Sequence, residues 1–193
     1  MDIFIVISLI AIIAWIIALY KNPTQWNQYV QYMPIVFFML YVQANGLTHD
    51  AWVHAFTASG LLAIGSIVLS VQQRVLMDRL FLGVNFFLLL GSAAFSFNIA
   101  PFIKWYSATN SGPFFSCIAM VGVLTTLCTP TGFLGKKGVN AEAARYGSFL
   151  LLAATFVALI WSVQQDAQGI LWAVIAPLLV LVFLQYQMKQ HIS

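Results

Sequence analysis

Three histidines, His49, His54 and His191, are the residues of this chain whose type is best suited to bind a haem or a metal ion. A haem held between helices needs two histidines that face each other inside the bundle. His49 and His54 lie five positions apart, which is about 140° around a helix axis, so they do not share a face. The distribution of Lys and Arg described below predicts that His191 lies on the opposite side of the membrane from His49 and His54. The sequence therefore predicts no haem and no other cofactor.

The two cysteines and the acidic residues do not form a reactive group either. Cys117 and Cys128 belong to one apolar segment, and roughly 16 Å of helix rise between them prevents a disulfide within that helix. No CxxC pair or Cys/His cluster typical of zinc occurs in the sequence. No apolar segment has an ionisable residue near its middle, where a proton relay or ion path needs one. The sequence predicts no metal site and no catalytic residues, which makes an enzyme an unfavoured third possibility.

The composition shows where the chain resides. Of its 193 residues, 62% are hydrophobic and 7% are charged, whereas an ordinary soluble domain has about 25% charged residues. Only helices or closed barrels satisfy their backbone inside a bilayer, and runs such as Phe86–Leu90 and Leu178–Leu184 are continuously apolar rather than alternating. The eight basic residues form no patch, so nucleic acid is not an expected partner. The predicted fold class is all-α and polytopic.

About seven transmembrane helices are predicted, each from an apolar segment near the length that crosses the hydrocarbon core. We treat residues 1–193 as a single transmembrane domain, with 1–32 as an extra N-terminal helix plus an interfacial segment and 33–193 as a six-helix region. The predicted spans are Ile3–Tyr20, Met33–Leu47, Ala51–Val71, Leu80–Asn98, Pro113–Cys128, Gly147–Val163 and Ile170–Tyr186.

The basic residues between these spans predict the orientation. With seven spans, one side of the membrane has only Lys104, and the other has Lys21, Arg74, Arg79, Lys136, Lys137, Arg145 and Lys189. Cytoplasmic loops carry the excess of Lys and Arg. We therefore expect the N-terminus outside and the C-terminus in the cytoplasm. The longest cytoplasmic connection contains Gly132, Gly135 and Gly138. It is predicted to be mobile and to be the only loop large enough to offer a partner a surface.

A few polar and small residues inside or beside the spans are candidates for contact. Asn85 lies a few residues inside the fourth span, where it could form an interhelical hydrogen bond or contact a substrate or lipid. Lys104 and Trp105 could anchor the chain at the headgroups or bind an anionic lipid or an external partner. Small residues in the third and fourth spans, such as Ala55, Ser59 and Gly91, predict that these two helices pack together.

A four-residue string occurs twice. Ser-Val-Gln-Gln stands at Ser70–Gln73 and again at Ser162–Gln165, each time between two predicted spans but on opposite sides of the membrane. Small carriers are often built from inverted repeats. The string therefore leaves open a repeat that relates the second to fourth spans to the fifth to seventh.

Two motifs resemble the intracellular septation protein A family, small polytopic inner-membrane proteins of Gram-negative bacteria. Met33–Tyr41, with Pro34, Phe37, Phe38 and Tyr41, is similar to the family's Leu-Pro-x-x-x-Phe-Phe-x-x-Tyr opening, with the tyrosine one position off. Phe102–Trp105 matches its Phe-Ile-Lys-Trp segment. The resemblance covers about Met33 to the C-terminus, and the family's following Pro-Thr is absent here. It implies a non-enzymatic role in envelope synthesis and division, with Phe37, Phe38, Tyr41, Lys104 and Trp105 as the matching positions.

The sequence thus predicts a multi-pass protein of the bacterial inner membrane without a catalytic site. We expect it to act through contacts with membrane lipids and other integral membrane proteins, in the cell envelope or as an accessory subunit of a membrane complex. The alternative is a small transporter, or a lipid- or isoprenoid-binding carrier, that takes a neutral or amphiphilic ligand near Asn85.

Overall fold

The computed structural model describes residues 30–46, 48–72, 77–108, 111–136, 138, 140–164 and 171–191. Within these residues all regular secondary structure is helical, as the sequence predicts, in seven α-helices and one short π-helix. The predicted first span, Ile3–Tyr20, and most of the interfacial segment lie outside the described residues. The chain divides into two compact units, Met1–Met77 with Leu88–Phe97, and Asp78–Phe87 with Asn98–Ser193.

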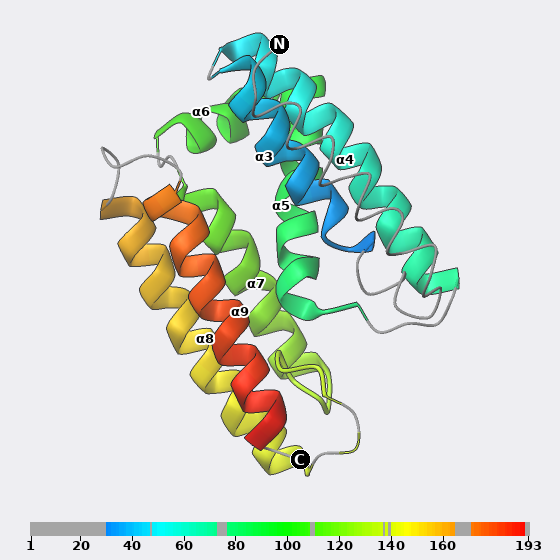
Figure 1. Ribbon diagram of the computed structural model, residues 1–193, viewed down its shortest axis with the longest axis vertical. Coiled ribbons are helices and arrows are strands. Elements are labelled where there is room, and N and C mark those ends of the chain that lie inside the picture. Colours follow the sequence, from blue (N-terminus) through cyan, green and yellow to red (C-terminus); the bar gives the residue numbers. More distant parts are fainter. Residues whose placement is uncertain are drawn as a thin grey trace. The chain divides into compact units, whose positions relative to one another are not determined.

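The first unit is built around a hairpin of a short and a long helix (Figure 1). Helix α3, Met33–Asn45, has Pro34 in its first turn, where the missing N–H costs no helical hydrogen bond. Helix α4, His49–Gln72, has Asp50 in its first turn. The backbone N–H of Ala51 donates to Thr48 Oγ1 over 3.3 Å. Thr48 therefore caps α4.

The second half of helix α5, Arg79–Ser96, packs closely on α4. A Cβ atom added at Gly60 would lie 2.5 Å from Ser92 Cβ, and one added at Gly91 would lie 2.2 Å from the ring of Phe56. Only residues without side chains allow helices to approach this closely. The predicted contact between the third and fourth spans is therefore confirmed for this half of α5.

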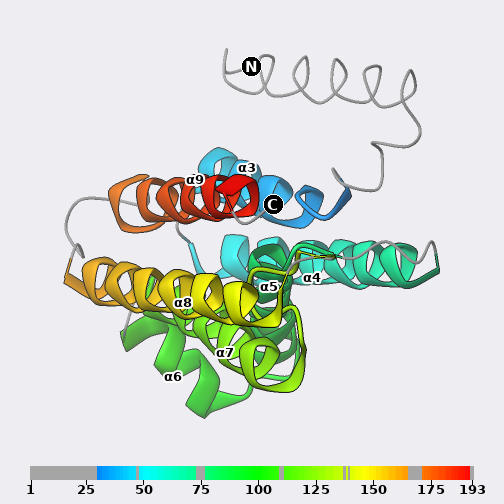
Figure 2. The same cartoon turned by 90° about the horizontal axis from the view of Figure 1, so that it is seen from below.

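The second unit contains the first half of α5 and the rest of the described chain. Its helices are α6, Ala100–Ala108, α7, Gly112–Cys128, α8, Ala141–Gln164, the π-helix η1, Leu171–Ile175, and α9, Ala176–His191. Figure 1 shows α7, α8 and α9 running alongside one another, and α6 lies beside α7 in Figure 2. Gly83 of α5 brings the two backbones together, since a Cβ there would lie 2.6 Å from Ile118 Cα of α7.

Helix α6 occupies a stretch for which the sequence predicts only a connection. Helix α5 ends at Ser96, and Asn98 follows with a φ of 51°, a left-handed conformation that asparagine tolerates better than most residues. The new helix starts at Ala100 with Pro101 as its second residue, a position that suits proline. A proline beside an apolar aromatic run was thus the signal for this helix.

The last helix begins with a wider turn. Residues 171–175 form a π-helix directly before α9, whose second residue is Pro177. Proline lacks the N–H that would bond to the carbonyl four residues earlier. A turn with bonds five residues apart lets the helix continue past this missing donor.

Four helices of the described chain are long and apolar enough to cross a membrane: His49–Gln72, Arg79–Ser96, Ala141–Gln164 and Trp172–His191. Helices α3 and α7 are shorter apolar helices of 13 and 17 residues, about 20 and 26 Å long at 1.5 Å per residue. Several predicted limits shift by a few residues. For example, the second predicted span ends at Asn45 instead of Leu47, the sixth begins at Ala141 instead of Gly147, and the seventh extends to His191.

Candidate functional site

A network of polar side chains lies at one end of the second unit, where α5 begins and α9 ends. Asp78 is its centre: Lys189 Nζ lies 2.8 Å from Asp78 Oδ2, and Gln185 Nε2 donates to Oδ1 over 3.1 Å. The backbone N–H of Leu80 also donates to Asp78 Oδ1 over 3.0 Å. One carboxylate thus caps α5 and ties it to the last turns of α9. We call Asp78, Arg79, Lys136, Gln185 and Lys189 the polar clasp.

Arg79 extends the clasp to the connection between α7 and α8. Its Nη1 donates to Thr129 Oγ1 and its Nη2 to Thr131 Oγ1, each over 2.6 Å. Thr129 Oγ1 in turn donates to the carbonyl of Thr125 over 2.6 Å. Arg79 is 9% exposed, so this cation is withdrawn from water and held by uncharged hydroxyl groups. Lys136 adds a further cation, because its Nζ donates to the carbonyl of Lys189.

The connection that carries these threonines is packed against the helices, where the sequence predicts a mobile loop. Phe133 and Leu134 are fully buried, and the N–H of Leu134 donates to Ser148 Oγ over 3.1 Å. Gly132 has a φ of 53°, and a Cβ there would lie 2.2 Å from Ser148 Oγ. The glycines therefore shape a tight fold of residues 131–135 against α8, and the prediction of a mobile segment is wrong for that stretch.

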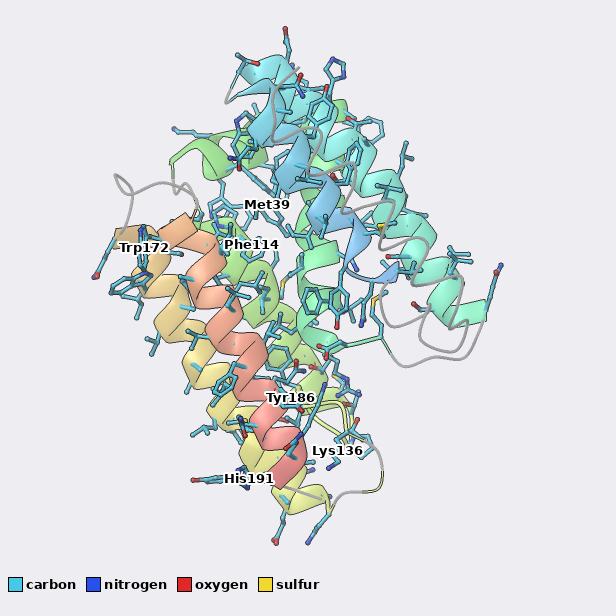
Figure 3. The ribbon with its side chains drawn as sticks, viewed as in Figure 1. Met39, Phe114, Lys136, Trp172, Tyr186 and His191 are labelled. Carbon is cyan, nitrogen blue, oxygen red and sulfur yellow. The ribbon has the colours of Figure 1, made fainter. Side chains whose placement is uncertain are left out.

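Exposed aromatic residues mark two levels along α8 and α9. Tyr146 of α8 and Tyr186 of α9 are exposed near the clasp, while Trp161 of α8 and Trp172 of η1, directly before α9, are exposed at the opposite end. Figure 3 shows Tyr186, Lys136 and His191 towards one end and Trp172 towards the other. Fifteen residues separate the two levels along α8, and fourteen separate them along η1 and α9, roughly 21–23 Å at 1.5 Å per residue. Tyr and Trp collect at both surfaces of a bilayer.

Between these levels the outward faces of α8 and α9 are apolar. The large exposed side chains are Phe149, Leu150, Phe156, Val157 and Ile160 of α8, and Leu179, Val180 and Phe183 of α9. Such a face, closed by aromatic residues at each end, is typical of helices in contact with lipid tails. The clasp therefore lies at the depth of the lipid headgroups if these helices cross a bilayer.

The candidate residues near the start of the first unit have unequal positions. Phe38 is buried and packs against Phe56 and Trp52, with ring centroids 4.7 and 5.7 Å away. Phe37 is exposed and its ring centroid lies 5.9 Å from that of Tyr41. Phe38 is thus part of an aromatic core, whereas Phe37 is exposed beside the half-buried Tyr41.

The other three candidates belong to the second unit, so the six residues form two sets. Asn85 is completely buried in the first half of α5. Lys104 is exposed, and Trp105 packs edge-on against Tyr106 with centroids 5.5 Å apart. Burial raises the pKa of Tyr106 well above its usual range, so its hydroxyl stays protonated and donates to the carbonyl of Phe87 over 3.1 Å.

Sequence reasoning did not find the clasp. It used Arg79, Lys136 and Lys189 only as markers of orientation and did not single out Asp78. The available signal was an acidic residue directly before an apolar helix, within a region that is otherwise basic. A capping acid of this kind is a candidate partner for cations on neighbouring helix ends.

The comparisons with known proteins give no relative. No protein-family model, no curated protein and no solved structure matches this chain. No group of three His, Cys, Asp or Glu residues that could hold a metal ion occurs among the described residues.

Proposed function

We propose that this chain is a multi-pass protein of the bacterial inner membrane that acts through contacts with other membrane proteins and lipids rather than by catalysis. One observation carries the proposal. The polar side chains of the clasp bond to one another, to two threonine hydroxyls and to a carbonyl, while the outward faces of α8 and α9 are apolar between two aromatic levels. Between these levels, α8 and α9 therefore present an apolar helical surface to their surroundings, which recognises lipid tails and other transmembrane helices.

The proposed orientation places the clasp in the cytoplasm. Arg79, Lys136 and Lys189 lie together at one end of the second unit. Their clustering supports the cytoplasmic assignment by the rule that Lys and Arg remain inside. The envelope and division role rests on the resemblance of Met33–Tyr41 and Phe102–Trp105 to the septation protein A family.

Co-purification tests the proposed mode of action. The full chain carrying a C-terminal tag is extracted into nanodiscs with native lipid, and the particles are separated by mass. We expect particles that contain further membrane proteins in fixed proportion. The same tagged chain with Asp78→Lys, which breaks the clasp, tests whether these contacts depend on the native structure. This variant should retain fewer of the co-purifying membrane proteins. Particles that contain only a single copy of the unaltered chain would contradict the proposal.

A second candidate, a small carrier with a neutral or amphiphilic ligand near Asn85, is favoured by a repeated pattern. Ala141 follows His49 by 92 residues, so the two long helices start in one register. Their caps obey it too, because Thr48 and Asn140 each accept a backbone N–H through a side-chain oxygen.

The buried faces of the two long helices follow the same register. Six pairs of positions 92 residues apart are buried in both: Ala55 and Gly147, Phe56 and Ser148, Ser59 and Leu151, Ala63 and Thr155, Ser66 and Ala158, Ser70 and Ser162. In the predicted topology α4 and α8 cross the membrane in opposite directions. The pattern therefore supports inverted repeats, which are common in carriers.

Cysteine labelling tests whether the repeats are inverted. Gln72→Cys and Gln164→Cys are introduced separately after Cys117→Ser and Cys128→Ser, and whole cells are treated with a membrane-impermeant maleimide. We expect the Gln164→Cys variant to be labelled from outside and the Gln72→Cys variant only after the membrane is opened. Labelling of both variants from the same side would contradict inverted repeats and weaken the case for a carrier.

A further inference from the structure

We propose that the polar clasp binds the phosphate of an anionic phospholipid headgroup. This inference rests on the proposed function in one respect, that the chain lies in a membrane. It adds a specific ligand class and a defined site at the start of α5 and the end of α9.

The charges of the clasp favour an anion. Arg79, Lys136 and Lys189 contribute three formal positive charges, whereas Asp78 contributes a single negative charge. Lys136 Nζ bonds to a carbonyl at the end of α9 instead of a carboxylate. The clasp therefore keeps a local excess of positive charge, which a phosphate would balance.

The donors of Arg79 fit such a ligand. A guanidinium group has five N–H donors in a planar fork, and two of them bond to the hydroxyls of Thr129 and Thr131. These threonines hold the guanidinium in place without neutralising it. A phosphate oxygen at the same fork would form charge-assisted hydrogen bonds, which are shorter and stronger than those to a neutral hydroxyl.

The depth of the clasp selects a lipid over a free ion. Lys189 lies three residues beyond Tyr186 on α9, about 4.5 Å further from the apolar face. Tyr186 is exposed, and its hydroxyl accepts a hydrogen bond from Gln190 over 2.7 Å. A lipid whose tails lie along Phe183 and Val180, which are both exposed, would place its phosphate at this level.

Native mass spectrometry of the delipidated full chain tests the site. The probes are dioleoylphosphatidylglycerol, dioleoylphosphatidylcholine and inorganic phosphate, each titrated separately. We expect the anionic lipid to bind more tightly than the zwitterionic lipid. Lys136→Gln should weaken binding of the anionic lipid by roughly fivefold, since a basic residue near anionic lipid contributes about 1 kcal/mol to binding. Arg79→Lys removes the planar guanidinium group but keeps the positive charge, and it should also weaken binding of the anionic lipid.

Lys104→Gln is the matched control, because it removes one exposed positive charge outside the clasp. Equal binding of the two lipids would overturn the proposed site in the clasp. Equal losses of affinity for the anionic lipid in Lys136→Gln and Lys104→Gln would also overturn it. Inorganic phosphate that binds alone and displaces the lipid would overturn the assignment to a headgroup. Alkaline carbonate extraction tests the membrane location separately from the headgroup site. A chain that stays in the membrane after extraction but binds both lipids equally contradicts only the proposed headgroup site.

Discussion

A Gly83→Ala variant is expected to lose about 2–3 kcal/mol of unfolding free energy, since forced overpacking of a close contact commonly costs this much. The added methyl group would lie 2.6 Å from Ile118 Cα and 3.2 Å from Ile118 Cγ1. Because the nearest atom belongs to the backbone, no side-chain rotation relieves the clash. Helices α5 and α7 must separate, and the first half of α5 loses its packing. Thermal unfolding in nanodiscs, followed by circular dichroism, measures the effect.

Gly65→Ala is the matched control. Gly65 also lies inside a transmembrane candidate helix, but a Cβ there meets nothing within 4 Å. Alanine is the better helix former, and we expect this variant to gain up to about 1 kcal/mol. If the Gly83→Ala and Gly65→Ala variants have the same midpoint of thermal unfolding, the close contact of α5 with α7 does not exist.

The second large effect is expected from Asp78→Ala, which removes the centre of the polar clasp. The variant loses the ion pair with Lys189, the hydrogen bond from Gln185 and the cap on Leu80 N–H. A helix cap contributes about 1 kcal/mol, and a hydrogen bond to a charged group about 1.5–3 kcal/mol. Lys189 is 32% exposed, so water screens part of its attraction. We expect a total loss of roughly 2–4 kcal/mol.

Asp50→Ala provides the control for this variant. Asp50 is an exposed acid in the first turn of α4, whose cap is supplied by Thr48. Removing it should cost no more than about 1 kcal/mol, the usual contribution of a charge at a helix end. A double-mutant cycle with Lys189→Met isolates the ion pair. Additive losses in the cycle would show that Asp78 and Lys189 do not interact.

The composition and the apolar segments predicted the helical class and the positions of six helices, because long apolar runs leave the backbone few alternatives. The small residues around Gly91 also predicted a local contact between two helices correctly. These features depend on neighbours along the chain or on one pair of helices. Such interactions can be derived without knowing the rest of the fold.

The polar clasp could not be derived in the same way. Asp78 and Lys189 are far apart in the sequence and become partners only when α9 returns to the start of α5. The loop fold around Phe133 depends similarly on Ser148 of the next helix. Helix α6 was missed for a local reason, since its nine residues are too few for the length criterion of a span.

In-cell photocrosslinking tests whether the outward faces of α8 and α9 contact other membrane proteins. Benzoylphenylalanine replaces Phe149, Phe156 or Phe183, which face outward, and Phe115, which is fully buried and serves as the control. We expect discrete protein adducts at one or more outward positions and none at Phe115, in membranes of living cells at native expression. Crosslinks to lipid alone at all three outward positions would contradict a function that depends on contacts with other membrane proteins.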